Sequence, residues 1–62
     1  MSKKLTTKEQ LFVMEYLACN NGAEAARRAG YSEHTAKEIA YENLTNPHIT
    51  DAIEAKRPEQ ME

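Results

Sequence analysis

Apolar residues recur every three or four positions in four stretches of this chain, and residues that start or stop helices separate the stretches. That spacing places the apolar side chains on one face of a helix. The first stretch follows Thr6 and Glu9, a capping box in which each side chain bonds a free backbone N–H. We therefore expect a helix over residues 7–19. Its core stripe consists of Phe12, Val13, Tyr16 and Leu17.

The same helix carries a second apolar row on roughly its opposite side, made of Leu11, Met14 and Ala18. A helix that is apolar on two sides needs two partners. We expect a fourth helix, or the bend of the chain, to cover this row. The alternative is a contact with a neighbouring subunit. Cys19, at the end of the helix, is expected to be a small core residue and not a reactive thiol.

The segment over residues 21–44 is expected to form two short helices joined by a tight turn over residues 29–32. Gly30 should end the first of these helices, because only glycine adopts the left-handed conformation of a helix C-terminus at no steric cost. Ser32 then follows at a position where its side chain can cap the next helix. The turn is therefore expected to end one helix and to begin the next.

The helix before the turn is expected to span residues 22–29, with Asn21 and Glu24 repeating the capping-box spacing at its start. Its small side chains let another helix come close. These are Ala25, Ala26 and Ala29.

The helix after the turn is expected to run from Glu33 to Leu44 or Thr45. Its inward side consists of Ala36, Ile39, Ala40, Asn43 and Leu44. Its outward side consists of His34, Lys37, Glu38 and Tyr41, with Thr35 and Glu42 more lateral. This pattern is typical of a helix-turn-helix, whose second helix enters the DNA major groove. We predict an all-α fold, a small three- to four-helix domain containing a helix-turn-helix; an ordinary αα-hairpin is the alternative.

A last helix is expected over residues 47–57, with Asn46 as its cap and Pro47 at its first position. One side of it carries Ile49, Ala52, Ile53 and Lys56. Pro58 should stop it. The expected organisation is a flexible N-terminus at 1–4, a DNA-binding domain at 5–57, and a tail or the start of a linker at 58–62.

The length and composition narrow the function classes further. Sixty-two residues suffice for one small domain and leave no room for an ATPase or a multi-layer enzyme. No apolar run approaches the roughly 18 residues of a membrane span, and no secretory signal is expected. The chain has one cysteine, no Cys/His cluster, no glycine-rich phosphate loop and no nucleophile elbow. We therefore expect no membrane partner, no metal, no cofactor and no enzymatic activity, and a reducing, intracellular setting.

The net charge of −2 argues against strong binding of nucleic acid by this chain alone. The charges are, however, unevenly distributed. Residues 1–37 carry six Lys or Arg against four Glu, whereas residues 38–62 carry two Lys or Arg against six Asp or Glu. The basic half contains the first helix of the proposed motif and the start of the second.

Candidate DNA-binding residues follow from the helix-turn-helix interpretation. They are Lys8, Arg27, Arg28, Ser32, His34, Thr35, Lys37, Glu38 and Tyr41. At least one of the adjacent arginines is expected to contact a phosphate; the alternative is that both are simply solvated. Phosphates repel carboxylates, although Glu can accept a hydrogen bond from the cytosine amino group. We expect Glu42 to lie away from DNA and leave Glu38 open.

The segments LTTKEQLFVMEYL and NGAEAARRAGYS, followed by Thr35-Ala36, ENL at residues 42–44 and Pro47, resemble the DNA-binding domain of the small terminase subunit of tailed bacteriophages and prophages. The resemblance covers residues 5–53. Two departures are Thr7, where many family members carry Pro, and Gly22-Ala23, where they often carry Ala-Thr. Neither departure touches the turn or the core stripe.

The resemblance implies a role in viral genome packaging, in the cytoplasm of the bacterial host. The family's small subunit recognises the packaging site on double-stranded viral DNA and hands that DNA to the large subunit, which supplies the ATPase and the nuclease. Family members form rings through a region C-terminal to the DNA-binding domain, so we expect a homo-oligomeric ring only with that region. The alternatives are a helical protein-interaction module, docking through the second apolar row, and a transcription regulator with a helix-turn-helix.

Overall fold

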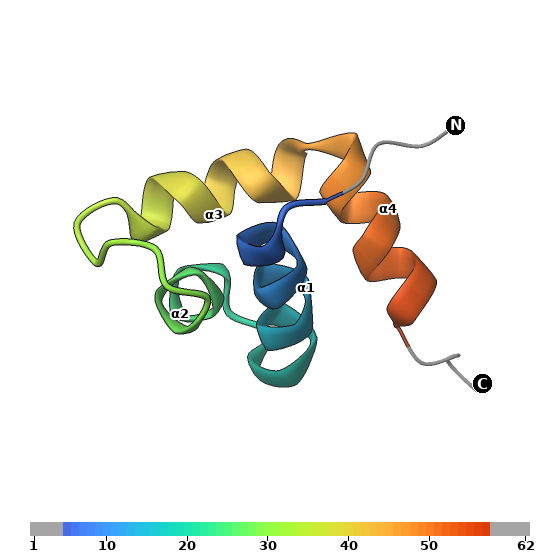
Figure 1. The fold of residues 1–62 in the computed structure, drawn as a ribbon, viewed down its shortest axis with the longest axis horizontal. Coiled ribbons are helices and arrows are strands. Elements are labelled where there is room, and N and C mark those ends of the chain that lie inside the picture. The colour runs from blue at the N-terminus through green and yellow to red at the C-terminus, as the bar shows by residue number, and fades with distance from the viewer. Residues whose placement is uncertain (1–4, 58–62) are drawn as a thin grey trace.

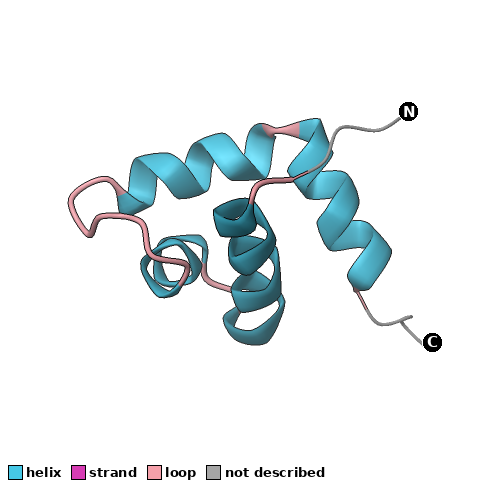
Figure 2. Ribbon diagram, viewed as in Figure 1, coloured by secondary structure: helices cyan, strands magenta, loops and turns pink. Residues whose placement is uncertain are grey.

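The computed structural model describes residues 5–57 and contains, within that range, four helices and no strand (Figures 1 and 2). They are α1 (Thr7–Cys19), α2 (Gly22–Arg28), α3 (Ala36–Thr45) and α4 (Pro47–Lys56). The predicted all-α class is confirmed. The expected flexible N-terminus at 1–4, the stop at Pro58 and the expected tail at 58–62 lie outside the described residues.

Capping side chains begin three of the four helices. The Thr6 hydroxyl accepts from the Glu9 N–H at 3.1 Å, while the Glu9 carboxylate accepts from the Thr6 N–H at 2.9 Å, so the predicted capping box is complete. The Asn46 side chain accepts from the His48 N–H at 2.9 Å, with Pro47 in the first turn of α4. The predicted bounds of α1 are confirmed by the structure, and α4 ends one residue earlier than expected.

The start of α2 shows only half of the predicted capping box. The Asn21 side chain accepts from the Glu24 N–H at 3.1 Å, as expected for a cap. The Glu24 carboxylate, however, binds Arg27 and Arg28. The reason is that two guanidinium groups one turn further along the helix compete for this carboxylate and offer charged hydrogen bonds.

The chain reverses after α2 in a Schellman motif, which closes the helix with two backbone hydrogen bonds. The Gly30 N–H donates to the Arg27 carbonyl at 3.1 Å, and the Tyr31 N–H donates to the Ala26 carbonyl at 3.0 Å. Gly30 has a φ of 104°, and Ala29 is the last residue with helical dihedrals. The predicted role of Gly30 is confirmed.

The prediction that α3 begins at Glu33 with Ser32 as its cap is wrong. The Ser32 hydroxyl accepts from the His34 N–H at 3.2 Å, and the Ser32 carbonyl accepts from the Thr35 N–H at 3.1 Å. These local bonds hold a separate turn, because a serine side chain offers the nearby backbone an alternative to the helix. The α helix begins at Ala36, and the connection after α2 is longer than expected.

The core lies where the four helices meet. Helix α2 packs against α1 and α3, and α4 packs against α3 and α1. In Figure 1, α3 runs along the top, and α1 and α2 both lie beneath it. The large, fully buried side chains are Phe12, Val13 and Ile49, with Ile53 nearly so. The remaining buried apolar residues are all alanines, namely Ala25, Ala26, Ala29, Ala36 and Ala40.

The predicted inward side of α3 is confirmed. Ala36, Ala40 and Asn43 are buried, while Ile39 and Leu44 are partly buried against the same core. The side-chain nitrogen of Asn43 has no hydrogen-bond partner among residues 5–57. An unpaired buried amide group costs about 1–3 kcal/mol.

The second apolar row of α1 is uncovered in the part of the chain that the structure describes. Leu11 is 40% exposed, Met14 is 59% exposed, and Ala18 is exposed as well. The expectation that a fourth helix or the bend of the chain covers this row is wrong. The reason is that α4 inserts Ile49 and Ile53 into the main core instead.

We expect Gly30→Ala to lower the free energy of unfolding by about 1–3 kcal/mol. A Cβ at Gly30 would meet only the Lys8 side chain, at 3.7 Å, so the cost comes from the positive φ and not from crowding. A chemically synthesised chain with D-alanine at this position is the control, since D-residues favour positive φ. Urea denaturation followed by circular dichroism would show this chain at least as stable as the original. Equal losses for both alanines would contradict the argument.

We expect Gly22→Ala to destabilise the domain by roughly 1–2 kcal/mol, because a Cβ there would lie 3.0 Å from the Ala40 Cβ and 3.2 Å from the Leu44 Cδ1. The better helix propensity of alanine offsets at most about 1 kcal/mol of this cost. The Ala40→Gly change made together with it should restore part of the loss in a double-mutant cycle. A stability gain from Gly22→Ala alone would show that α2 and α3 can accommodate an added methyl group without strain.

Candidate nucleic-acid interface

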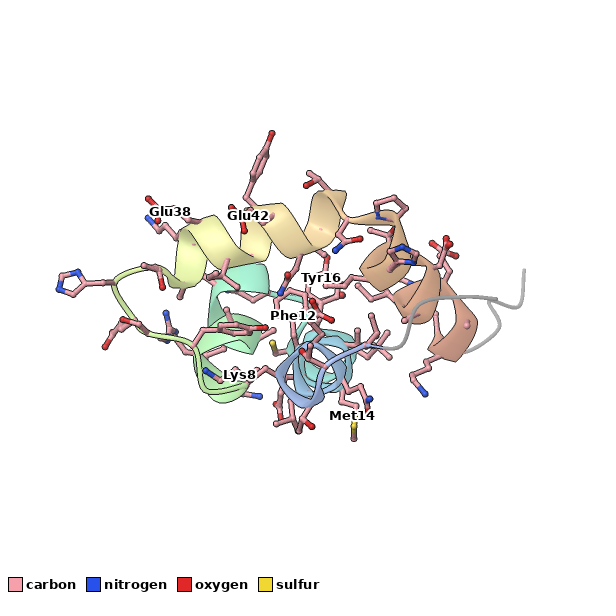
Figure 3. All side chains as sticks on the ribbon, turned by 45° about the horizontal axis from the view of Figure 1, so that its top comes forward. Lys8, Phe12, Met14, Tyr16, Glu38 and Glu42 are labelled. Carbon is pink, nitrogen blue, oxygen red and sulfur yellow. The ribbon has the colours of Figure 1, made fainter. Side chains whose placement is uncertain are left out.

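The outward side of α3 is exposed along its length. Of the candidate residues, Ser32, His34, Thr35, Lys37, Glu38 and Tyr41 are all exposed. Tyr41 is 73% exposed, which is unusual for a large aromatic side chain. Figure 3 shows Glu38 and Glu42 on α3, with Met14 on the far side of the molecule, on α1. The exposed side of α3 and the turn before it are therefore both accessible to a large partner such as duplex DNA.

Lys8 does not belong to that surface. Its Nζ lies 5.1 Å from the centre of the Tyr31 ring, a cation–π contact between α1 and the connection that precedes α3. Figure 3 shows Lys8 well separated from Glu38 and Glu42. The structure thus divides the candidates into an α3 surface and a group of cations on α1 and α2.

Arg27 and Arg28 are neither buried nor freely solvated, because Glu24 binds both. Arg28 Nε lies 3.1 Å from Glu24 Oε2, and Arg27 pairs with Glu24 Oε1. Arg28 also reaches across to α1, where its NH1 lies 3.5 Å from Glu15 Oε1. We did not anticipate this ion-pair cluster. The spacing of Glu24 from the two arginines, three and four residues, was a signal for part of it.

The cluster shifts the titration of its members. The hydrogen bond from Arg28 and the charge of Arg27 lower the pKa of Glu24 below its usual value of 4.5. The hydrogen bond to Glu24 raises the pKa of Arg28. The side chains of the cluster are 32–47% exposed, so solvent screens these interactions.

The exposed side of α3 is not basic. It carries Lys37 against Glu38 and Glu42, and His34 lies in the turn before it. Cations that could meet phosphates therefore come from elsewhere, and the nearest in sequence are the arginines at the end of α2. No group of three or more His, Cys, Asp or Glu that could hold a metal ion occurs within residues 5–57.

Comparison with known proteins gives the family. A family model described as terminase small subunit matches residues 5–62. The chain belongs to the terminase small subunit family. Among individual members, the terminase small subunit of Bacillus phage SF6 is 40% identical over 57 residues, and that of Bacillus phage SPP1 is 43% identical over 54 residues. These matches cover 90% and 86% of this chain.

The chain spans about two fifths of the length of these terminase small subunits, since the matches cover 39% and 37% of the two phage proteins. The predicted resemblance to small terminase subunits is confirmed. The individual DNA-contacting residues remain predictions, as does the division into terminal segments and a DNA-binding domain. None of the helices in the described range is long and apolar enough to cross a lipid bilayer.

We expect the Glu24 cluster of this terminase small subunit domain to stabilise it at neutral pH and not in acid. A carboxyl group whose pKa is lowered by folding stabilises the fold above its unfolded pKa, here about 4.5, and loses that effect as the pH falls through its folded pKa. The Tm of the original chain should therefore exceed that of Glu24→Gln at pH 7, and the difference should shrink as the pH falls below about 4.5. A constant difference between pH 7 and pH 3, measured by circular dichroism, would argue against the ion pairs.

Proposed function

We propose that this chain is the DNA-binding domain of a terminase small subunit, which recognises a packaging site on double-stranded viral DNA. The proposal rests on one observation above all: α3 follows a glycine turn and has its outward side uncovered, as the second helix of a helix-turn-helix must. Family membership supplies the biological setting. The large subunit would receive the DNA and supply the ATPase and nuclease, while this chain contributes recognition and no catalysis.

The charge of the chain limits the affinity of a single domain for DNA, and several linked copies would raise that affinity. With a net charge of −2 and few free cations, one domain should bind duplex DNA weakly. Domains tethered in a homo-oligomeric ring would bind the same DNA together, and linking raises affinity by about 10²–10⁴ without any new contact. We propose that a further region of the complete protein forms this ring in the cytoplasm of the bacterial host.

A second candidate function has its own observation. The exposed Leu11 and Met14 on α1 could dock a partner helix, which would make this chain a protein-interaction module. A salt titration separates the two functions, because DNA binding weakens steeply with salt and an apolar contact does not. Amide chemical shifts measured during titration with a short duplex would show which surface responds: α3 for DNA binding, the outer row of α1 for docking.

If α3 and the turn before it read bases, Lys37→Ala and His34→Ala should change the preferred DNA sequence, since a good base contact provides roughly 1–3 kcal/mol of discrimination. Lys56→Ala is the matched control for Lys37→Ala, because it removes the same charge from an exposed position on α4. Selection from a random duplex library reports the preference. Unchanged preferences in every α3 variant, with equal losses on specific and unrelated duplexes, would remove base reading by this helix.

A further inference from the structure

The two adjacent arginines of α2 are held to different extents. Arg28 is bound by two carboxylates, at 3.1 Å from Glu24 and at 3.5 Å from Glu15 on α1. Within residues 5–57, Arg27 is paired with Glu24 alone. Both guanidinium groups are similarly exposed, with side chains 42% and 47% accessible, so exposure does not distinguish them. The difference is that only Arg28 joins two helices.

The two arginines also lie on different sides of α2. Successive helical residues are rotated by about 100°, so Arg27 and Arg28 diverge, with Glu24 between them. Arg28 points to the α1 side, where it meets Glu15. The α3 side of α2 is marked by Gly22, which lies against Ala40 and Leu44 of α3. Helix geometry places Arg27 about 140° and Arg28 about 120° from Gly22, on opposite flanks of α2.

We propose that the adjacent arginines divide two tasks: Arg27 is the residue that contacts a DNA phosphate, and Arg28 is a structural residue that fastens α2 to α1. This inference rests on the proposed function. Glu24 offers Arg27 only Oε1, because its Oε2 binds Arg28, whereas a phosphate can offer two acceptor oxygens to one guanidinium group. When Arg27 transfers to phosphate, Glu24 keeps Arg28 as its partner, so no charge is left unpaired. Transfer of Arg28 would break both of its ion pairs and the tie to α1.

Glu24 is then a positioning residue that also competes with DNA. Its carboxylate holds the Arg27 side chain in the free protein and must give that side chain up when DNA binds. Removing the charge of Glu24 should therefore strengthen DNA binding, and the gain should depend on Arg27. A general charge effect would raise affinity whatever residue stands at position 27.

The first test compares Arg27→Ala with Arg28→Ala, which change the net charge equally. Binding of the 62-residue chain to a 20-base-pair duplex is measured by fluorescence anisotropy between about 50 and 200 mM NaCl. We expect Arg27→Ala to weaken binding about three- to tenfold and to reduce the salt slope by about 0.9, the value for one phosphate contact. Arg28→Ala should stay within about twofold in affinity with an unchanged slope and should lower the Tm. A loss of slope in Arg28→Ala instead would overturn the assignment.

The second test is a double-mutant cycle on Glu24. We expect Glu24→Gln to raise affinity about threefold or more, and the Glu24→Gln/Arg27→Ala double variant to show no such gain over Arg27→Ala. Glu54→Gln is the matched control, since it removes one negative charge from an exposed position on α4. Equal gains from Glu24→Gln and Glu54→Gln, or a gain that persists without Arg27, would overturn the role of Glu24.

Failure of this inference and failure of the proposed function are distinguishable. If the original chain and all variants bind duplex DNA with the same salt dependence, DNA binding stands and the division of tasks falls. If neither the original chain nor Glu24→Gln binds the duplex even at 50 mM NaCl, while both remain folded by circular dichroism, the proposed function itself falls.

Discussion

The direction in which the chain leaves α2 decides what α3 can do. That direction is set by backbone hydrogen bonds alone: the Gly30 and Tyr31 N–H groups close the end of α2, and a φ of 104° at Gly30 turns the chain out of the helix. Everything on the outward side of α3 depends on this reversal, because α1 and α2 lie on the same side of α3 and leave its other side free (Figure 1). A local conformational requirement thus controls the orientation of a whole surface.

The charged side chains of α2 are organised around Glu24. Glu24 serves the start of α2 through its backbone N–H and the end of α2 through its carboxylate, so one residue links a helix cap to an ion-pair cluster. The cluster partly neutralises the two arginines at the end of α2, which lowers the positive charge that this helix offers to a partner.

Features that depend on near neighbours in sequence could be predicted, and features that depend on distant ones could not. Thr6 with Glu9, Asn46 with Pro47, and Gly30 each act within a few residues, and each was predicted correctly. The prediction for Ser32 was wrong because its side chain can either cap a helix or hold a separate turn, and the sequence does not show which of the two is more stable. The contact of Arg28 with Glu15 joins two helices, so it needs their packing to be known. Lys37, Glu38 and Tyr41 lie on the exposed side of α3, as expected. The contact of Lys8 with Tyr31 joins α1 to the connection before α3, so it also needs the packing to be known.

The alanine-rich contact between α2 and α3 has a consequence of its own. Alanine side chains have no rotamers, so the two helices meet almost backbone to backbone, and neither can absorb an added methyl group by rotating a side chain. A larger side chain at Gly22 or Ala40 is therefore expected to push α3 away from α2. The volume of these buried residues therefore sets the position of α3 on the rest of the domain, and a substitution at this contact can move the exposed side of α3 without changing any residue on it.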